Sequence, residues 1–163
     1  MKKLYLTLLL SLPLFSDGFL FDPLSKNLHG KSFVSLGLVQ QNTDTYGNSQ
    51  ALNLSYNFIH KSNFGVEVGY VQSLDEAKHR TKDLTTDFSS VSAFATHLLA
   101  FDPHIGLKTK VGYAKNKHAE DGLAYGAELI FQVTKTTGLS VAYHQMNKNM
   151  KYIMINTVYR LKH

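Results

Sequence analysis

The chain ends on Tyr152-Ile153-Met154-Ile155-Asn156-Thr157-Val158-Tyr159-Arg160-Leu161, a stretch in which the side chains alternate in character. Residues of one parity are Ile153, Ile155, Thr157, Tyr159 and Leu161, whereas Asn156, Val158 and Arg160 have the other parity. Because successive side chains of a strand point to opposite faces, the stretch predicts a strand with one apolar, aromatic-tipped face and one more polar face. In an exported chain, such an ending is typical of an outer-membrane barrel.

The beginning of the chain reads as an export signal. Two lysines follow Met1, an apolar run extends from residue 4 to residue 15, and small residues follow at 16–18. This pattern predicts a secretory signal peptide over residues 1–18, which leaves 19–163 as the mature barrel domain. An uncleaved N-terminal anchor is the alternative, although the run is short for a membrane-spanning helix.

Composition excludes several classes of protein. The chain has no cysteine, so disulfide frameworks, thiolate metal sites and catalytic cysteines are ruled out. Its net charge of +5 is scattered, without the dense basic face that nucleic-acid binding needs. No later apolar stretch is long enough to predict a second transmembrane helix.

Eight alternating segments predict eight strands. They cover about 32–42, 48–59, 64–73, 87–100, 105–115, 122–133, 138–147 and the C-terminal run. In the fourth, either Phe94 and Leu98 or Val91, Ala95 and Leu99 point outward. We therefore predict an all-β fold, an eight-stranded antiparallel up-and-down transmembrane β-barrel. A soluble β-sandwich or lipocalin-like barrel is the alternative.

The connections alternate in length, as they do in bacterial barrels. Short turns are expected at 60–63, 101–104 and 134–137, and the longer polar links are 74–86 and 116–121. Short turns lie on the periplasmic side of such barrels. Aromatic residues are expected in two bands: Phe58, Phe64, Phe131 and Tyr159 near the short turns, and Tyr70, Phe88, Tyr113, Tyr125 and Tyr152 near the loops, with Tyr152 of inward parity.

These features resemble the small OmpA/OmpX-like outer-membrane β-barrel family. The resemblance covers about residues 32–161, and its most specific element is Thr157-Val158-Tyr159-Arg160-Leu161. The family's terminal strand ends in Tyr-Arg-Phe, whereas this chain has Leu161, followed by Lys162 and His163. The resemblance implies recognition of the last strand by the barrel assembly machinery. Family members serve in structural support, adhesion or small-pore formation, so the fold does not define one function.

Five charged residues have inward parity: Glu67, Lys108, Lys110, Glu128 and Arg160. Antiparallel pairing of the fifth and sixth strands places Glu128 opposite Lys108 or Lys110. Because unpaired buried charge is costly, we expect a salt-bridge network that fills the lumen. A gated or selective ion path is the alternative.

An enzyme is not predicted. Lipid A deacylases resemble this chain in size and carry a histidine with a serine two residues later. Here Met146 follows His144 at that spacing, and Ser140 lies four residues away. The eight histidines show no tight metal-ligand spacing, so we expect no catalytic residue, metal or cofactor.

The sequence therefore predicts a non-enzymatic protein of the bacterial outer membrane that supports membrane integrity, surface interactions through its outer loops, or both. The alternatives are a narrow pore and a lipid-modifying enzyme. The expected partners are outer-membrane lipid, lipopolysaccharide and the barrel assembly machinery, with an unidentified surface ligand and no nucleic acid.

Overall fold

The computed structural model describes residues 30–101 and 104–161. The predicted signal peptide therefore lies outside the described residues. The strands are β1 (Lys31–Thr43), β2 (Asn48–Ile59), β3 (Phe64–Ser73), β4 (Ala77–Lys78), β5 (Thr85–Thr86), β6 (Ser90–Ala100), β7 (Ile105–Asn116), β8 (Gly122–Gln132), β9 (Thr137–Asn147) and β10 (Met150–Arg160). Within the described ranges there is no helix long and apolar enough to cross a membrane.

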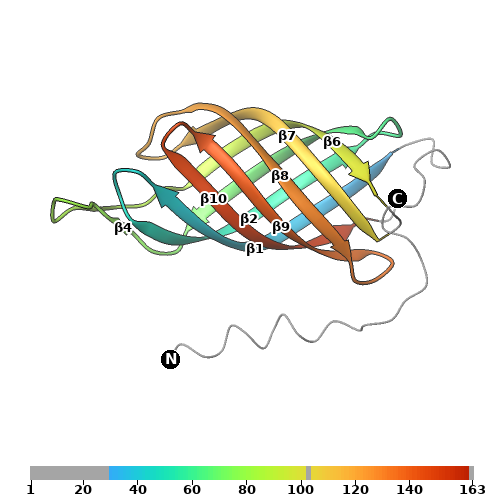
Figure 1. Ribbon diagram of the computed structural model, residues 1–163, viewed down its shortest axis with the longest axis horizontal. Coiled ribbons are helices and arrows are strands. Elements are labelled where there is room, and N and C mark those ends of the chain that lie inside the picture. The colour runs from blue at the N-terminus through green and yellow to red at the C-terminus, as the bar shows by residue number, and fades with distance from the viewer. Residues whose placement is uncertain (1–29, 102–103, 162–163) are drawn as a thin grey trace.

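Eight of these strands close into one barrel (Figure 1). Each of them pairs antiparallel with its neighbour, in the order β1, β2, β3, β6, β7, β8, β9, β10. The β1–β10 ladder runs from Phe33–Arg160 to Thr43–Met150 and closes the sheet. Closure leaves no strand edge unpaired, as a membrane interior requires. The predicted eight-stranded antiparallel barrel is confirmed, and the alternative of a β-sandwich is wrong.

The two faces of the wall have opposite polarity. Aliphatic and aromatic side chains cover the exterior, including Leu54, Val68 and Ile155, each more than half exposed. The interior positions between them hold Asn53, Ser55 and other polar residues, all buried. A soluble barrel would bury its apolar face instead, so this wall has the polarity of a transmembrane barrel.

The facing of the fourth barrel strand, β6, is now settled. Val91 and Leu99 point outward, with 57% and 43% of their surface exposed, whereas Phe94 and Leu98 are buried in the lumen. Ala95 shares the outward face. The predicted orientation in which Val91, Ala95 and Leu99 point outward is therefore correct.

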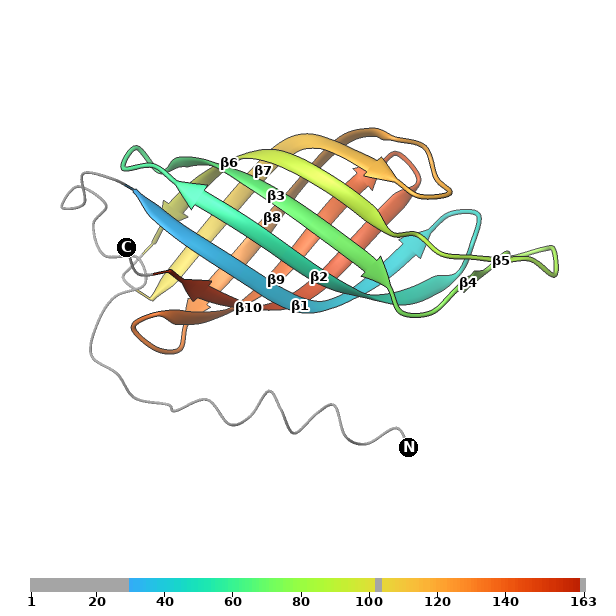
Figure 2. The same ribbon diagram turned by 180° about the vertical axis from the view of Figure 1, so that it is seen from behind.

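The link after β3 contains a strand pair that the sequence analysis did not predict. β4 and β5 pair antiparallel through Ala77–Thr86 and Lys78–Thr85. The resulting hairpin projects beyond the end of the barrel (Figures 1 and 2). This end is called the loop end below, and the opposite end, with the tight turns, is called the turn end.

Phe88 corrects the predicted aromatic band of the loop end. Tyr70, Tyr113 and Tyr125 are exposed on the wall as predicted, but Phe88 is buried. Its ring packs edge-on against Tyr46, with 5.3 Å between ring centroids. The residue precedes β6 rather than belonging to it, so strand parity does not apply, and the apolar ring folds inward.

Candidate functional site in the barrel lumen

Two lysines and two glutamates meet in the middle of the lumen. Lys108 Nζ lies 2.7 Å from Glu67 Oε2 and 2.8 Å from Glu128 Oε2. Lys110 Nζ lies 2.6 Å from Glu67 Oε1 and 3.3 Å from Glu128 Oε2. All four side chains are at most 3% exposed. This ionic quartet (Glu67, Lys108, Lys110 and Glu128) has no net charge, so each buried ion is compensated within it.

Strand register explains how the quartet assembles. Lys108 is directly opposite Glu128 in the β7–β8 ladder, which decides between the two registers that the sequence left open. Lys110 pairs with Gly126 in the same ladder, and the ring of His144 occupies the place that a side chain on Gly126 would take. A Cβ atom on Gly126 would lie 2.4 Å from the Tyr143 carbonyl oxygen, so a larger residue there forces the wall to shift.

Neutral side chains extend the quartet across the lumen. Ser140 Oγ donates to Glu128 Oε1 at 2.6 Å, and Asn156 Nδ2 donates to Ser140 Oγ at 3.3 Å. Asn53 Nδ2 donates to Asn156 Oδ1 at 3.0 Å. The sequence analysis did not include these three residues in the lumen network, although their inward parity and polarity can be read from the strand pattern. The chain of bonds links β8, β9, β10 and β2 around the quartet.

Apolar layers cover the quartet on both sides along the barrel axis. A cluster of five buried side chains lies toward the turn end: Phe33, Ile59, Leu98, Ile130 and Val158. A larger cluster, which includes Val39, Phe94, Met146, Met150 and Met154, begins beside the quartet, where Phe94 pairs with Glu67, and extends toward the loop end. Ions are poorly solvated beside such apolar side chains, and the four charged side chains are themselves at most 3% exposed, so the quartet is enclosed rather than set along an open path.

A second polar layer closes the lumen at the loop end. Gln41 Nε2 donates to the Phe88 carbonyl oxygen at 2.6 Å and to Tyr152 Oη at 3.0 Å, and Tyr152 Oη donates to the same carbonyl at 3.1 Å. Ser49 and Ser73 donate to Gln41 Oε1 at 3.0 and 2.9 Å. Ser73 Oγ also accepts from the Phe88 backbone N–H at 2.9 Å. We call this group (Gln41, Ser49, Ser73, Phe88 and Tyr152) the outer cap.

Arg160 is not one of the four residues that these ion pairs join. It is half-buried and is the last residue of β10. Through the β8–β9–β10 ladders, Glu128 is in line with Met154, six residues before Arg160. At about 3.3 Å per residue this separation is roughly 20 Å along the strand.

His144 and Ser140 are both inward and buried, but they do not form a nucleophile–base pair. Ser140 Oγ donates a hydrogen bond to Glu128 instead, and no described residue hydrogen-bonds His144 Nε2. The two residues are four positions apart on one strand, roughly 13 Å. Acyl transfer needs a hydroxyl within hydrogen-bond reach of the imidazole, and this geometry does not supply it. Across the described residues no cluster of histidines and carboxylates is arranged to hold a metal ion.

At the loop end, Asp87 joins two loops. Its carboxylate lies 3.0 Å from Lys117 Nζ and 2.9 Å from His118 Nδ1. The hydrogen bond from Lys117, supported by that from His118, lowers the pKa of the Asp87 carboxyl below its ordinary value. This contact ties the 116–121 loop to the segment that enters β6.

Comparison with known proteins identifies the fold. No family model matches the chain, and no curated protein does. Among solved structures, the chain resembles Ail, the attachment invasion locus protein of Yersinia pestis, which was solved in complex with the heparin analogue sucrose octasulfate. The TM-score is 0.58, and the identity is 22% over an alignment that covers 82% of this chain and 99% of Ail.

Two further structures have the same architecture. The outer membrane protein OprG from Pseudomonas aeruginosa has a TM-score of 0.58 at 11% identity, over 82% of this chain and 97% of OprG. A de novo designed transmembrane β-barrel reaches 0.63 at 14% identity, over 81% of this chain and 96% of the design. At these identities the likeness concerns the fold. The chain is a small eight-stranded β-barrel of the outer-membrane type.

Proposed function

We propose that this chain is a non-enzymatic protein of the bacterial outer membrane that strengthens the membrane and presents its loops for surface contact. The observation that carries the proposal is the filled lumen, in which a neutral ionic quartet lies between two apolar layers. A filled lumen favours a structural barrel over a pore. It leaves the lipid-facing wall and the loops as the surfaces through which the protein acts.

The export steps belong to the same proposal. Residues 1–18 are removed as a signal peptide, and the barrel assembly machinery recognises the terminal strand that carries Tyr159. N-terminal sequencing of the protein isolated from outer membranes tests the first step. A mature chain that begins at or near Phe19 is expected, and retention of Met1 would favour the anchor.

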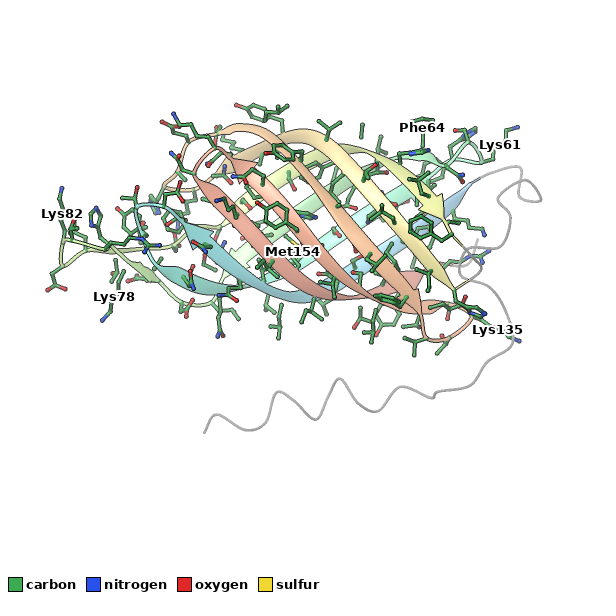
Figure 3. The ribbon with its side chains drawn as sticks, in the orientation of Figure 1. Lys61, Phe64, Lys78, Lys82, Lys135 and Met154 are labelled. Carbon is green, nitrogen blue, oxygen red and sulfur yellow. The ribbon has the colours of Figure 1, made fainter. Side chains whose placement is uncertain are left out.

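The β4–β5 hairpin is the candidate surface for contact with other molecules. It extends beyond the barrel and carries Lys78 and Lys82 (Figure 3). Its sequence also contains Arg80 and acidic residues. Rigid barrels commonly carry recognition on such loops. Sulfated saccharides are a rational first probe because Ail was solved with one.

One genetic experiment separates the two roles. Three strains of the host are compared: one with the wild-type gene, one with the gene deleted, and one with a variant in which residues 75–86 are exchanged for a short Gly-Ser turn. Membrane integrity is read from sensitivity to hydrophobic antibiotics, and surface contact from binding of cells to sulfated saccharide. We expect the deletion to lose both and the hairpin variant to lose only binding.

The alternatives have distinct signatures in the same strains. A lipid-modifying enzyme would change the lipid A mass spectrum upon overexpression, and we expect an unchanged spectrum. If sensitivity and binding are the same in all three strains, the proposed function is wrong.

A further inference from the structure

The charged residues of this barrel are distributed unevenly along its axis. At the loop end, residues 44–48, 74–88, 115–121 and 148–151 contain seven Lys or Arg and seven Asp or Glu. The ionic quartet adds two of each. Both regions are therefore neutral in formal charge.

The excess positive charge lies at the turn end. Among described residues this end carries four basic side chains, Lys31, Lys61, Lys135 and Arg160, and no Asp or Glu. Of the undescribed residues after position 30, Asp102 and Lys162 have opposite formal charges. Lys31 is buried, whereas Lys61 and Lys135 are exposed and Arg160 is half-buried. Lys61 and Lys135 lie at the end opposite Lys78 and Lys82 (Figure 3).

An aromatic belt lies directly beside these cations. Phe64 is 62% exposed on the wall, three residues after Lys61, and its ring stacks on His97 with 4.5 Å between centroids. Phe131 precedes Lys135 by four residues, and Tyr159 adjoins Arg160. Aromatic rings of barrels lie at the level of the lipid headgroups. Cationic side chains just beyond such a belt extend their heads into the phosphate layer.

We propose that the turn-end rim, formed by Lys61, Lys135 and Arg160, binds the headgroups of anionic phospholipids in the membrane leaflet at that end. The inference rests on the proposed function, because it requires the barrel to span a membrane. Charge complementarity supports a lipid partner: clustered Lys and Arg at a membrane surface attract anionic lipid over roughly a Debye length. The neutral loop end has no comparable preference.

The test uses the mature chain refolded into phosphatidylcholine vesicles that contain a minor fraction of spin-labelled phosphatidylglycerol or spin-labelled phosphatidylcholine. The measured quantity is the ratio of the two labelled lipids in the motionally restricted shell around the barrel. We expect wild type to prefer phosphatidylglycerol several-fold, and the preference to decline at high salt.

Matched variants locate the effect. Lys61→Gln with Lys135→Gln should remove most of the preference, whereas Lys78→Gln with Lys82→Gln removes the same charge from the hairpin and should retain it. Equal losses in the two variants, or no preference in wild type, would overturn the inference. Insertion is checked independently by the heat-dependent shift of the folded band on SDS gels. A wild-type chain that does not insert would overturn the proposed function and this inference together, whereas an inserted chain without lipid preference would overturn only the inference.

Discussion

The lumen contains two polar layers that use different chemistry. The ionic quartet neutralises four buried charges with one another, whereas the outer cap joins neutral groups around the Phe88 backbone. The two layers should therefore lose different amounts of stability when one member is removed. Removing one ion leaves a buried charge without compensation, whereas removing one neutral group leaves at most an unpaired polar atom, which costs less.

The largest effect is expected for Lys108→Ala. This lysine contacts both glutamates, so its removal leaves two buried carboxylates with one cation. We expect the free energy of unfolding to fall by about 3–5 kcal/mol. Urea titration of the refolded barrel measures the change, and Lys82→Ala in the exposed hairpin is the control. A loss similar to that of the control would mean that water, rather than the neighbouring ions, compensates the quartet.

A paired replacement measures how strongly the charges of the quartet depend on one another. Lys108→Gln with Glu128→Gln removes the directly opposed cross-strand pair but leaves Lys110 and Glu67, 2.6 Å apart, as a neutral unit. We expect the double variant to unfold at a higher urea concentration than either single variant, because contacting charges are not additive. Additive losses in this double-mutant cycle would show that the four residues do not act as one group.

In the outer cap, Tyr152→Phe tests the neutral layer. The substitution removes the hydroxyl that accepts from Gln41 and donates to the Phe88 carbonyl. We expect a loss of about 1–2 kcal/mol in the same titration, smaller than that of Lys108→Ala. Tyr113→Phe is the matched control, since that ring lies exposed on the wall and should show little change. If Tyr152→Phe costs more than Lys108→Ala, the proposed ranking of the two layers is wrong.

The smallest effect concerns Asp87, outside the lumen. Because contacts with Lys117 and His118 lower its pKa, the carboxylate stays charged at neutral pH, and these contacts are lost only as pH falls through that lowered value. Carbon-13 NMR of the Asp87 carboxyl should give a midpoint below about 3.9, the ordinary aspartate value. Lys117→Gln should raise the midpoint without altering global stability. An ordinary midpoint in wild type would contradict the contact.

Sequence patterns predicted the wall better than the ends. Period-two alternation set the faces of β2 and β8 because one side of each strand contacts polar lumen and the other does not. Glu67, Lys108, Lys110 and Glu128 were readable from parity alone. Parity does not give the depth of a residue, however, so Arg160 was grouped with the quartet although it lies about 20 Å along β10 from Met154, the residue in line with Glu128.

The outer cap depended on information that alternation does not contain. Phe88 lies outside a strand, and its inward position results from hydrogen bonds to Ser73 and Gln41, which belong to distant parts of the chain. β4 and β5 are two residues each, too short to produce a period. Loop conformation of this kind is set by tertiary contacts rather than by local pattern.

Single-channel recording in planar bilayers shows whether the lumen is filled and closed. Folded wild-type protein should insert without discrete current steps, because the quartet is enclosed by apolar layers. Glu128→Ala serves as the comparison, since it removes a side chain from the filled region. Reproducible, ion-selective steps from the wild-type barrel, altered in selectivity by Glu128→Ala, would show that the lumen conducts and identify the protein as a pore.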